Sequence, residues 1–209
     1  MSGDDDSVRV SGPAPGGVGL LIIDMLGNLA FEGSEPLLRS AERALPPILR
    51  LRAEADRLGV PVVYVNDNHG QWHSERSRIV EYCLRADNPG RDVARRLQPR
   101  SDDYFIIKPQ FSGFYATNLP VLLPKLGVTR LVMAGMAADI CVLFTAADAH
   151  MRAYALWAPP DALASLAEER TAWATQIMRD SMGADISPTT ALSLKDWVNR
   201  APDDASATR

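Results

Sequence analysis

The chain has 209 residues, of which 46% are hydrophobic and 23% charged, a composition typical of a soluble globular protein with one full-sized core. A formal net charge of -4 argues against nucleic acid as a partner, because phosphate binding needs a basic surface. No apolar run approaches the roughly 20 residues that cross a bilayer, and the acidic first residues are unlike a signal peptide. Two cysteines make no disulfide framework. We therefore expect a cytoplasmic enzyme or binding protein with a small-molecule ligand and no membrane partner.

The two ends of the chain differ from its middle. Residues 1–17 and 201–209 are polar and rich in small side chains, and we expect both to be flexible tails. No internal repeat or long low-complexity segment divides the part between them, so we expect residues 18–200 to form a single domain.

Short apolar runs alternate with segments of helical periodicity along this domain. In chain order, strands are expected at 18–23, 61–65, 104–107, 130–134, 153–157 and, shorter, 184–186. Helices are expected at 46–58, 77–84, 91–97, 119–126, 138–151 and 166–182, with a terminal helix at 195–200 that we expect to pack on another subunit. The strand runs are continuously apolar, which is typical of strands buried on both faces. The pattern predicts a three-layer α/β fold with a doubly wound, mainly parallel, Rossmann-like sheet of about six strands.

Three ionisable residues stand at or just beyond the ends of predicted strands. Asp24 and Lys108 close two of the apolar runs, and Cys141 lies just after a third. Singly, each has an ordinary structural interpretation: a turn-forming aspartate, a lysine that reaches solvent, a small buried cysteine. Ligands of doubly wound sheets bind beyond the carboxyl ends of the strands, and all three residues map to that edge. We therefore interpret them as one site.

This set of residues suits a nucleophilic cysteine. Cys141 falls in the first turn of the helix expected from residue 138, where the helix dipole favours a thiolate. A nearby Lys108 ammonium would lower the thiol pKa further, so we expect the thiolate to be the main form. Asp24 could accept the thiol proton and return it later to a leaving group.

Four segments resemble the isochorismatase-like cysteine hydrolases, the superfamily that includes nicotinamidases and N-carbamoylsarcosine amidases. With their order and spacing they cover most of residues 18–187. The segments are LLIIDMLGNLAF (20–31), GVPVVYVNDNHGQW (59–72), FIIKPQFSGFYATNL (105–119) and RLVMAGMAADICVLFTAADAHMRAYAL (130–156).

The resemblance implies an isochorismatase-like hydrolase fold with Asp24, Lys108 and Cys141 as catalytic triad. It also implies a cis peptide bond between Met136 and Ala137, and an oxyanion hole made by the backbone N–H groups of Ala137 and Cys141. The reaction would be thiolate attack on a carbonyl, loss of an amine or ammonia, and hydrolysis of a thioester. The family further suggests a homodimer or homotetramer.

A second group of residues raises the question of a metal. Nicotinamidases of this superfamily bind a divalent ion through a D-x-H pattern, which Asp67, His69 and His73 could provide for zinc. In metal-free relatives the same segment is a turn, and Gly70 and Trp72 fit that pattern. We expect no cofactor, with these three residues as ligands if the protein is metal-dependent.

Substrate-binding residues are less specified by the sequence. Phe31, Trp72 and Phe111 are candidate pocket walls, although the ordinary interpretation of each is a packed side chain. Ala138 stands where the family often has threonine, which removes one hydroxyl near the site but none of the triad.

Four functions remain open at this point. The first is a cysteine amidohydrolase that cleaves an amide, carbamoyl or ureido C–N bond. The second is a metal-containing nicotinamidase. The third is a metal-independent vinyl-ether hydrolase of the isochorismatase type, although such enzymes commonly lack the nucleophilic cysteine. The fourth is a non-catalytic binding protein on the same scaffold, although a site without catalytic function would tolerate loss of a triad member.

Overall fold

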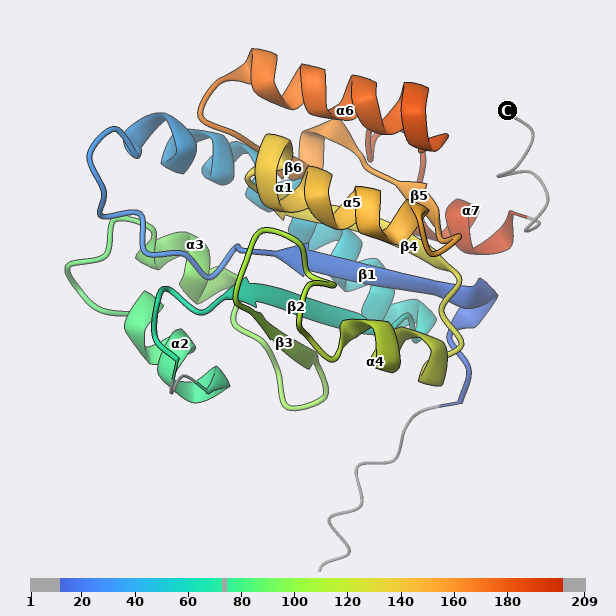
Figure 1. The fold of residues 1–209 in the computed structure, drawn as a ribbon, viewed down its shortest axis with the longest axis horizontal. Helices are drawn as coiled ribbons and strands as arrows, with labels where there is room; N and C mark the ends of the chain where they lie inside the picture. The colour runs from blue at the N-terminus through green and yellow to red at the C-terminus, as the bar shows by residue number, and fades with distance from the viewer. Residues whose placement is uncertain (1–11, 73–74, 201–209) are drawn as a thin grey trace, which may run out of the picture.

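The computed structural model describes residues 12–72 and 75–200, and its centre is a parallel sheet of six strands (Figure 1). Five strands follow the order β3-β2-β1-β4-β5, and β6 pairs with β4. The strands are β1 (Val18–Ile23), β2 (Val62–Asp67), β3 (Tyr104–Lys108), β4 (Arg130–Met136), β5 (Ala155–Trp157) and β6 (Leu163–Ala164). The predicted α/β class and doubly wound parallel sheet are confirmed.

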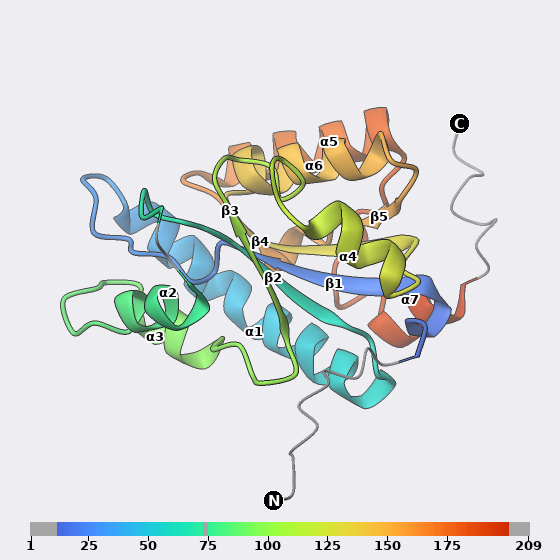
Figure 2. The ribbon, with the colours of Figure 1, turned by 60° about the horizontal axis from the view of Figure 1, so that its bottom comes forward.

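Helices cover both faces of the sheet, which gives three layers (Figure 2). The helices are α1 (Glu35–Leu58), α2 (Arg76–Cys83), α3 (Arg91–Arg96), α4 (Leu119–Lys125), α5 (Leu143–His150), α6 (Glu168–Met182) and α7 (Leu194–Asn199). Helices α1, α2, α3 and α7 lie on one face, and α4, α5 and α6 lie on the other. None of these helices, within the described ranges, is long and apolar enough to cross a membrane.

Strand β1 explains why the core has two halves. All six of its residues are buried, as the continuous apolar run predicts. Leu20 and Ile22 pack into the core beneath α1, whereas Leu21 and Ile23 pack into the core beneath α4, α5 and α6. Successive side chains of a strand point to opposite faces, so one apolar run serves both layers.

Helix α1 is longer than predicted. The prediction began it at Pro46, a residue type that is common in a first helical turn. The structure begins it at Glu35, with Pro46 and Pro47 inside the helix. An apolar face that includes Leu37 and Ile48 is buried along the whole length, and this burial outweighs the hydrogen bonds that the prolines remove.

Both ends of the described chain pack against strand β4. The Arg130 guanidinium donates to the carbonyl oxygens of Gly16, Trp197 and Val198. Trp197 of α7 is 3% exposed within its own chain, so the apolar face of this helix packs on its own domain, and the expected contact with another subunit stays a prediction. Ala14 is also buried, so the part of the expected 1–17 tail from residue 14 onward belongs to the domain. The rest of the expected tails, residues 1–11 and 201–209, lies outside the described residues.

The sixth strand is not where the sequence placed it. Residues 184–186 contribute a single bridge, between Asp185 and Trp157, whereas the sixth strand is β6. Strand β6 has only two residues, too few for a periodic pattern to reveal.

The strand order places the switch point of the sheet between β1 and β4. The chain proceeds from β1 outward through β2 and β3, then returns to the other side of β1 and continues through β4 and β5. Neighbouring loops diverge at such a switch point and leave a crevice at the carboxyl ends of the strands. Asp24 follows β1, and the turn that carries Cys141 follows β4.

Candidate active site

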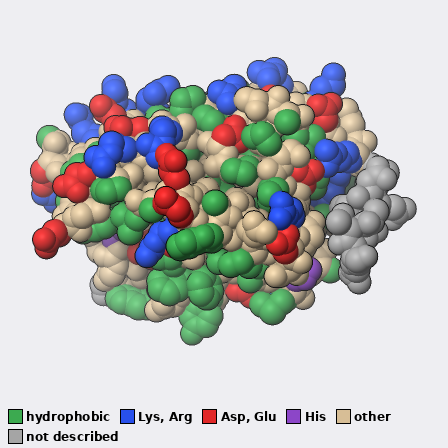
Figure 3. Space-filling view, turned by 90° about the horizontal axis from the view of Figure 1, so that it is seen from above, with side chains coloured by type: hydrophobic (Ala, Val, Ile, Leu, Met, Phe, Trp, Pro, Cys, Tyr) green, Lys and Arg blue, Asp and Glu red, His purple; other side chains and the backbone are tan. Residues whose placement is uncertain are grey.

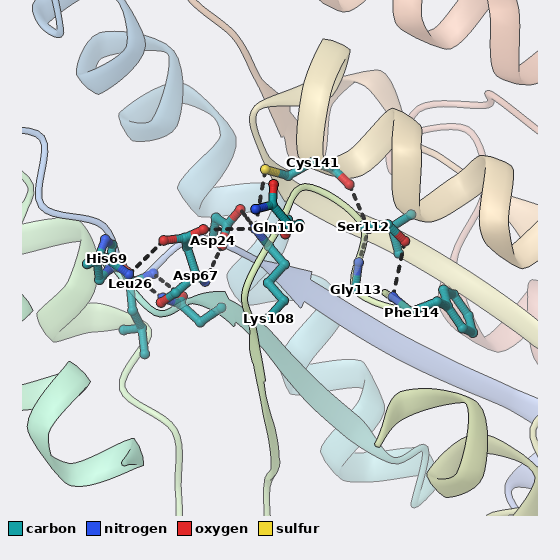
Figure 4. A network of polar contacts seen from close by, with 12 residues as sticks. Asp24, Leu26, Asp67, His69, Lys108, Gln110, Ser112, Gly113, Phe114 and Cys141 are labelled. Atoms are coloured by element: carbon teal, nitrogen blue, oxygen red, sulfur yellow. Dashed lines mark hydrogen bonds and ion pairs between the residues drawn. The ribbon is translucent and has the colours of Figure 1, made fainter. Parts of the chain in front are cut away.

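The side chains of Asp24, Lys108 and Cys141 converge at this edge of the sheet (Figure 4). The Lys108 Nζ lies 2.9 Å from Asp24 Oδ2 and 3.4 Å from Cys141 Sγ. Three residues that are far apart in the sequence therefore form one cluster, as the strand ends predicted.

Residues of strand β2 form hydrogen bonds with both the backbone and the side chain of Asp24. Its N–H continues the ladder by donating to the Val65 carbonyl at 2.9 Å, and its Oδ1 accepts the N–H of Asp67 at 2.7 Å. Its backbone has a φ of +51°, a conformation that is uncommon for residues other than glycine. These contacts hold the carboxylate so that Oδ2 faces Lys108.

Cys141 is carried by a tight turn at the end of β4. Gly135 has a φ of +123°, and a Cβ there would lie 2.0 Å from the carbonyl oxygen of Ile23, so only glycine fits. A cis peptide bond joins Met136 and Ala137. The chain then forms a π-helical turn, Ala138–Val142, before α5 begins. Cys141 therefore stands just before the first residue of α5.

Lys108 is a fully buried cation with several partners. Its side chain is 0% exposed. Besides Asp24 and Cys141, it donates to the Gln110 carbonyl at 3.2 Å and lies 3.6 Å from Asp67 Oδ2. Burial lowers the pKa of Lys108, but the negative charges of Asp24, Cys141 and Asp67 more than compensate, so the net shift is upward. The ammonium therefore stays charged at neutral pH.

The titration of Cys141 differs from the sequence-based expectation. Burial, and then the charge of Asp24, raises the pKa of the Cys141 thiol to about 12, although Lys108 acts in the opposite direction. The expectation of a resting thiolate is therefore wrong: desolvation outweighs the helix terminus and the ammonium. Burial also raises the pKa of Asp24 above its usual value of 3.8, against the charge of Lys108. A carboxyl group with a raised pKa is a better acceptor for the thiol proton.

A hydrogen-bond network ties the segment after β3 to α5, and the sequence analysis missed the part that Thr145 plays in it. Thr145 Oγ1 donates to the Cys141 carbonyl at 2.6 Å and accepts the N–H of Gly113 at 2.9 Å. One helical turn later, Asp148 accepts a 2.5 Å hydrogen bond from Ser112. The spacing of Cys141, Thr145 and Asp148 by four and three residues was the available signal, because such residues share a helix face.

The described residues do not assemble a metal site. Asp67 Oδ1 accepts the N–H of His69, whereas the His69 ring nitrogen Nε2 lies 3.1 Å from the Leu26 carbonyl and its ring faces Tyr82. Across residues 12–72 and 75–200, no group of three or more His, Cys, Asp or Glu side chains could hold a metal ion. The third predicted ligand, His73, lies outside the described residues. Asp67 and His69 therefore do not fit a shared ion in this arrangement.

The three aromatic candidates are all exposed, and one of them is linked to the site. Phe31 is 49% exposed, Trp72 77% and Phe111 53%. The Phe111 ring lies 5.7 Å from that of Phe144 on α5, one turn beyond Cys141. Figure 3 shows hydrophobic side chains gathered along one edge of the molecule. Phe111 remains the best-placed candidate, and no described contact brings Phe31 or Trp72 to the reacting groups.

Cys83, the other cysteine, has no counterpart of Lys108 or Asp24 among its described neighbours. It is fully buried, and burial raises the pKa of its thiol to about 12. Its Sγ lies 4.0 Å from His69 Nε2, and no described lysine or carboxylate contacts it. Its burial is that of a structural residue.

Comparison with known proteins places the chain in a family. The model of the isochorismatase domain matches residues 18–191. The uncharacterized isochorismatase family protein YaaI of Bacillus subtilis is 38% identical over 168 residues, 80% of this chain and 92% of that protein. A probable inactive nicotinamidase of Arabidopsis thaliana is 30% identical over 139 residues, 62% of this chain and 71% of that protein.

A solved structure supports the same placement. The N-carbamoylsarcosine amidase of Thermoplasma acidophilum superimposes with a TM-score of 0.64 at 28% identity, over 84% of this chain and 98% of that one. The fold, the order of the segments and the domain match agree, and this chain belongs to the isochorismatase family of hydrolases.

Proposed function

We propose that the protein is a cysteine-dependent amidohydrolase that cleaves a C–N bond in a small amide, carbamoyl or ureido compound. The observation that carries this proposal is the position of Lys108 Nζ, within 3.4 Å of Cys141 Sγ and 2.9 Å of Asp24 Oδ2. A thiol, a carboxylate base and a buried ammonium are the groups that nucleophilic attack on a carbonyl requires. The similarity to an N-carbamoylsarcosine amidase supports the choice of a C–N bond.

In the proposed reaction Asp24 accepts the proton of the Cys141 thiol as Sγ bonds to the substrate carbonyl carbon. Lys108 stabilises the negative charge on sulfur as it develops. Asp24 then returns the proton to the leaving nitrogen as the C–N bond breaks, which releases ammonia or an amine and leaves a thioester. Water attacks the thioester with Asp24 as base, and the acid product leaves with Cys141 again protonated.

The raised thiol pKa is consistent with this sequence of steps. A resting thiol is less readily oxidised than a thiolate, and the base that activates it is already in place. The backbone N–H groups of Ala137 and Cys141 are the proposed oxyanion hole. They belong to the turn on which the nucleophile stands, so they would face a carbonyl attacked by Sγ.

The test is ammonia release from a panel of neutral and charged amides, ureas and N-carbamoyl compounds that includes nicotinamide. Cys141→Ala should lose turnover of any substrate found, whereas Cys83→Ser, the matched control at the second cysteine, should retain it. Full turnover by Cys141→Ala contradicts the proposal. So does a native protein whose Cys141 resists every small electrophile, which would instead favour a non-catalytic binding protein.

A further inference from the structure

Asp67 is a second carboxylate at the reacting groups, and the proposed proton transfers do not use it. Its Oδ2 lies 3.6 Å from Lys108 Nζ. Its side chain is 39% exposed, compared with 14% for Asp24 and 0% for Lys108. Asp67 is therefore the most solvent-exposed of these three side chains, which lie close together in Figure 4.

The charges of the cluster do not balance. In the state that can react, Asp24 and Cys141 share one proton, so together they carry one negative charge whichever of them holds it. Lys108 carries one positive charge and offsets that pair. The carboxylate of Asp67 is then left over, and the cluster has a net charge of about one unit negative.

Neighbouring ionic groups do not neutralise this excess negative charge. Asp139, two residues before the nucleophile, is paired with Arg170 at 3.0 Å. Asp148 on α5 is paired with Arg152 at 2.6 Å. Within the part of the chain that the structure describes, Lys108 is the one cationic side chain in contact with the reacting groups.

We propose that Asp67 is a specificity-determining residue that favours neutral or cationic amides and ureas and disfavours those with a carboxylate beside the scissile bond. The inference rests on the proposed function and narrows its substrate class. Its physical basis is repulsion between like charges at a partly buried site, where water screens them incompletely. The metal-ligand role that the family resemblance suggests for Asp67 has no counterpart in the described arrangement of Asp67 and His69.

The test compares two alkylating agents of similar size and different charge, so it needs no known substrate. Iodoacetamide is neutral and iodoacetate is an anion, and both react with Cys141 by the same displacement of iodide. The rate of labelling is measured from the intact mass of the protein at neutral pH, and the labelled peptide is identified to confirm Cys141. Each rate is then divided by the rate of the same reagent with the uncharged small thiol 2-mercaptoethanol. We expect the native protein to favour iodoacetamide by about tenfold after this correction.

Asp67→Asn should then increase the absolute rate with iodoacetate by about fivefold or more. An increase in rate is informative because a damaged site would react more slowly, and Cys83 should stay unlabelled while the protein is folded. Asp92→Asn is the matched control: it removes the same charge from α3, where Asp92 pairs with Arg95 in solvent. This control should leave both rates unchanged. Added salt should reduce the selectivity of the native protein, which gives a measurement that requires no variant.

The outcomes separate the two proposals. Equal corrected rates for iodoacetate and iodoacetamide in the native protein would overturn the inference about Asp67 and leave the cysteine mechanism intact. An iodoacetate rate that does not rise in Asp67→Asn would also overturn it. Failure of both reagents to label native Cys141 would contradict the proposed nucleophile and, with it, the charge selection that depends on it.

Discussion

Replacement of Lys108 by methionine is the most direct test of how the site activates its thiol. Lys108→Met keeps the length of the buried side chain and removes the charge that lies 3.4 Å from Cys141 Sγ. At an effective dielectric constant of about 20, two unit charges at that separation attract by about 5 kcal/mol. Relaxation of the site and entry of water reduce this value, so we expect a loss of about 3 kcal/mol in thiolate stabilisation.

A loss of that size corresponds to alkylation of Cys141 by iodoacetamide that is about a hundredfold slower. The assay is the rate of mass increase of the intact protein, with the labelled peptide identified and thermal unfolding measured in parallel. Lys125→Met is the matched control, because Lys125 lies on the surface at the end of α4. Alkylation of Lys108→Met within about threefold of the native rate would refute the assignment of Lys108 as the charge that stabilises the thiolate.

Three further predictions follow from the same geometry. Asp24 must be ionised to take the thiol proton, and burial raises its pKa above 3.8, so the alkylation rate should fall as pH decreases through a midpoint above 3.8. Asp24→Asn should remove this dependence on acid pH, and an unchanged pH profile in that variant would contradict the role of Asp24 as base. Thr145→Val removes the hydroxyl that bonds the Gly113 N–H and the Cys141 carbonyl. The free energy of unfolding in a urea titration should therefore fall by about 1–3 kcal/mol, and the alkylation rate should decrease. Native values of both quantities would refute the role of Thr145 in holding the turn of Cys141. Protein purified and assayed with a chelator should keep its full alkylation rate, and one tightly bound zinc per chain by elemental analysis would contradict the expectation that no cofactor is needed.

The pKa values show how the cluster acts as a unit. Burial raises the pKa of both Asp24 and Cys141, so each favours the protonated form, and the nearby ammonium keeps the cost of ionising one of them low. A single proton shared by two such groups can move between them with little change in overall charge. The expected resting thiolate required only Lys108 and a helix terminus, and left out the desolvation that the fold imposes.

The sequence alone determined the positions of strands β1 to β5 and the reacting groups. The apolar run at 18–23 matches β1 residue for residue, because a strand buried on both faces leaves a continuous local signature. Asp24, Lys108 and Cys141 could be combined because parallel strands end at one edge, whatever their distance in the sequence. Local periodicity and strand direction were sufficient for both conclusions.

Other features depended on contacts that a local pattern does not contain. The start of α1 was missed because the proline pair resembles an N-terminus, and only burial of the whole helix face keeps it continuous. The packing of the terminal helix on its own domain was missed because nothing near Trp197 in sequence reveals Trp157, whose ring lies 5.9 Å away. Periodicity reports which face of an element is apolar, and the partner of that face is decided by the tertiary packing.

The same distinction holds within the site. The sequence indicated Asp67 only as a candidate metal ligand, whereas its register opposite Lys108 in β3 placed its carboxylate beside the reacting groups. The direction of the Cys141 pKa shift likewise required the burial of the whole cluster. The sequence determined which chemical groups are present and at which edge they meet. The tertiary structure decided their protonation and net charge, because desolvation and Coulomb interactions depend on distances between residues that are remote in the chain.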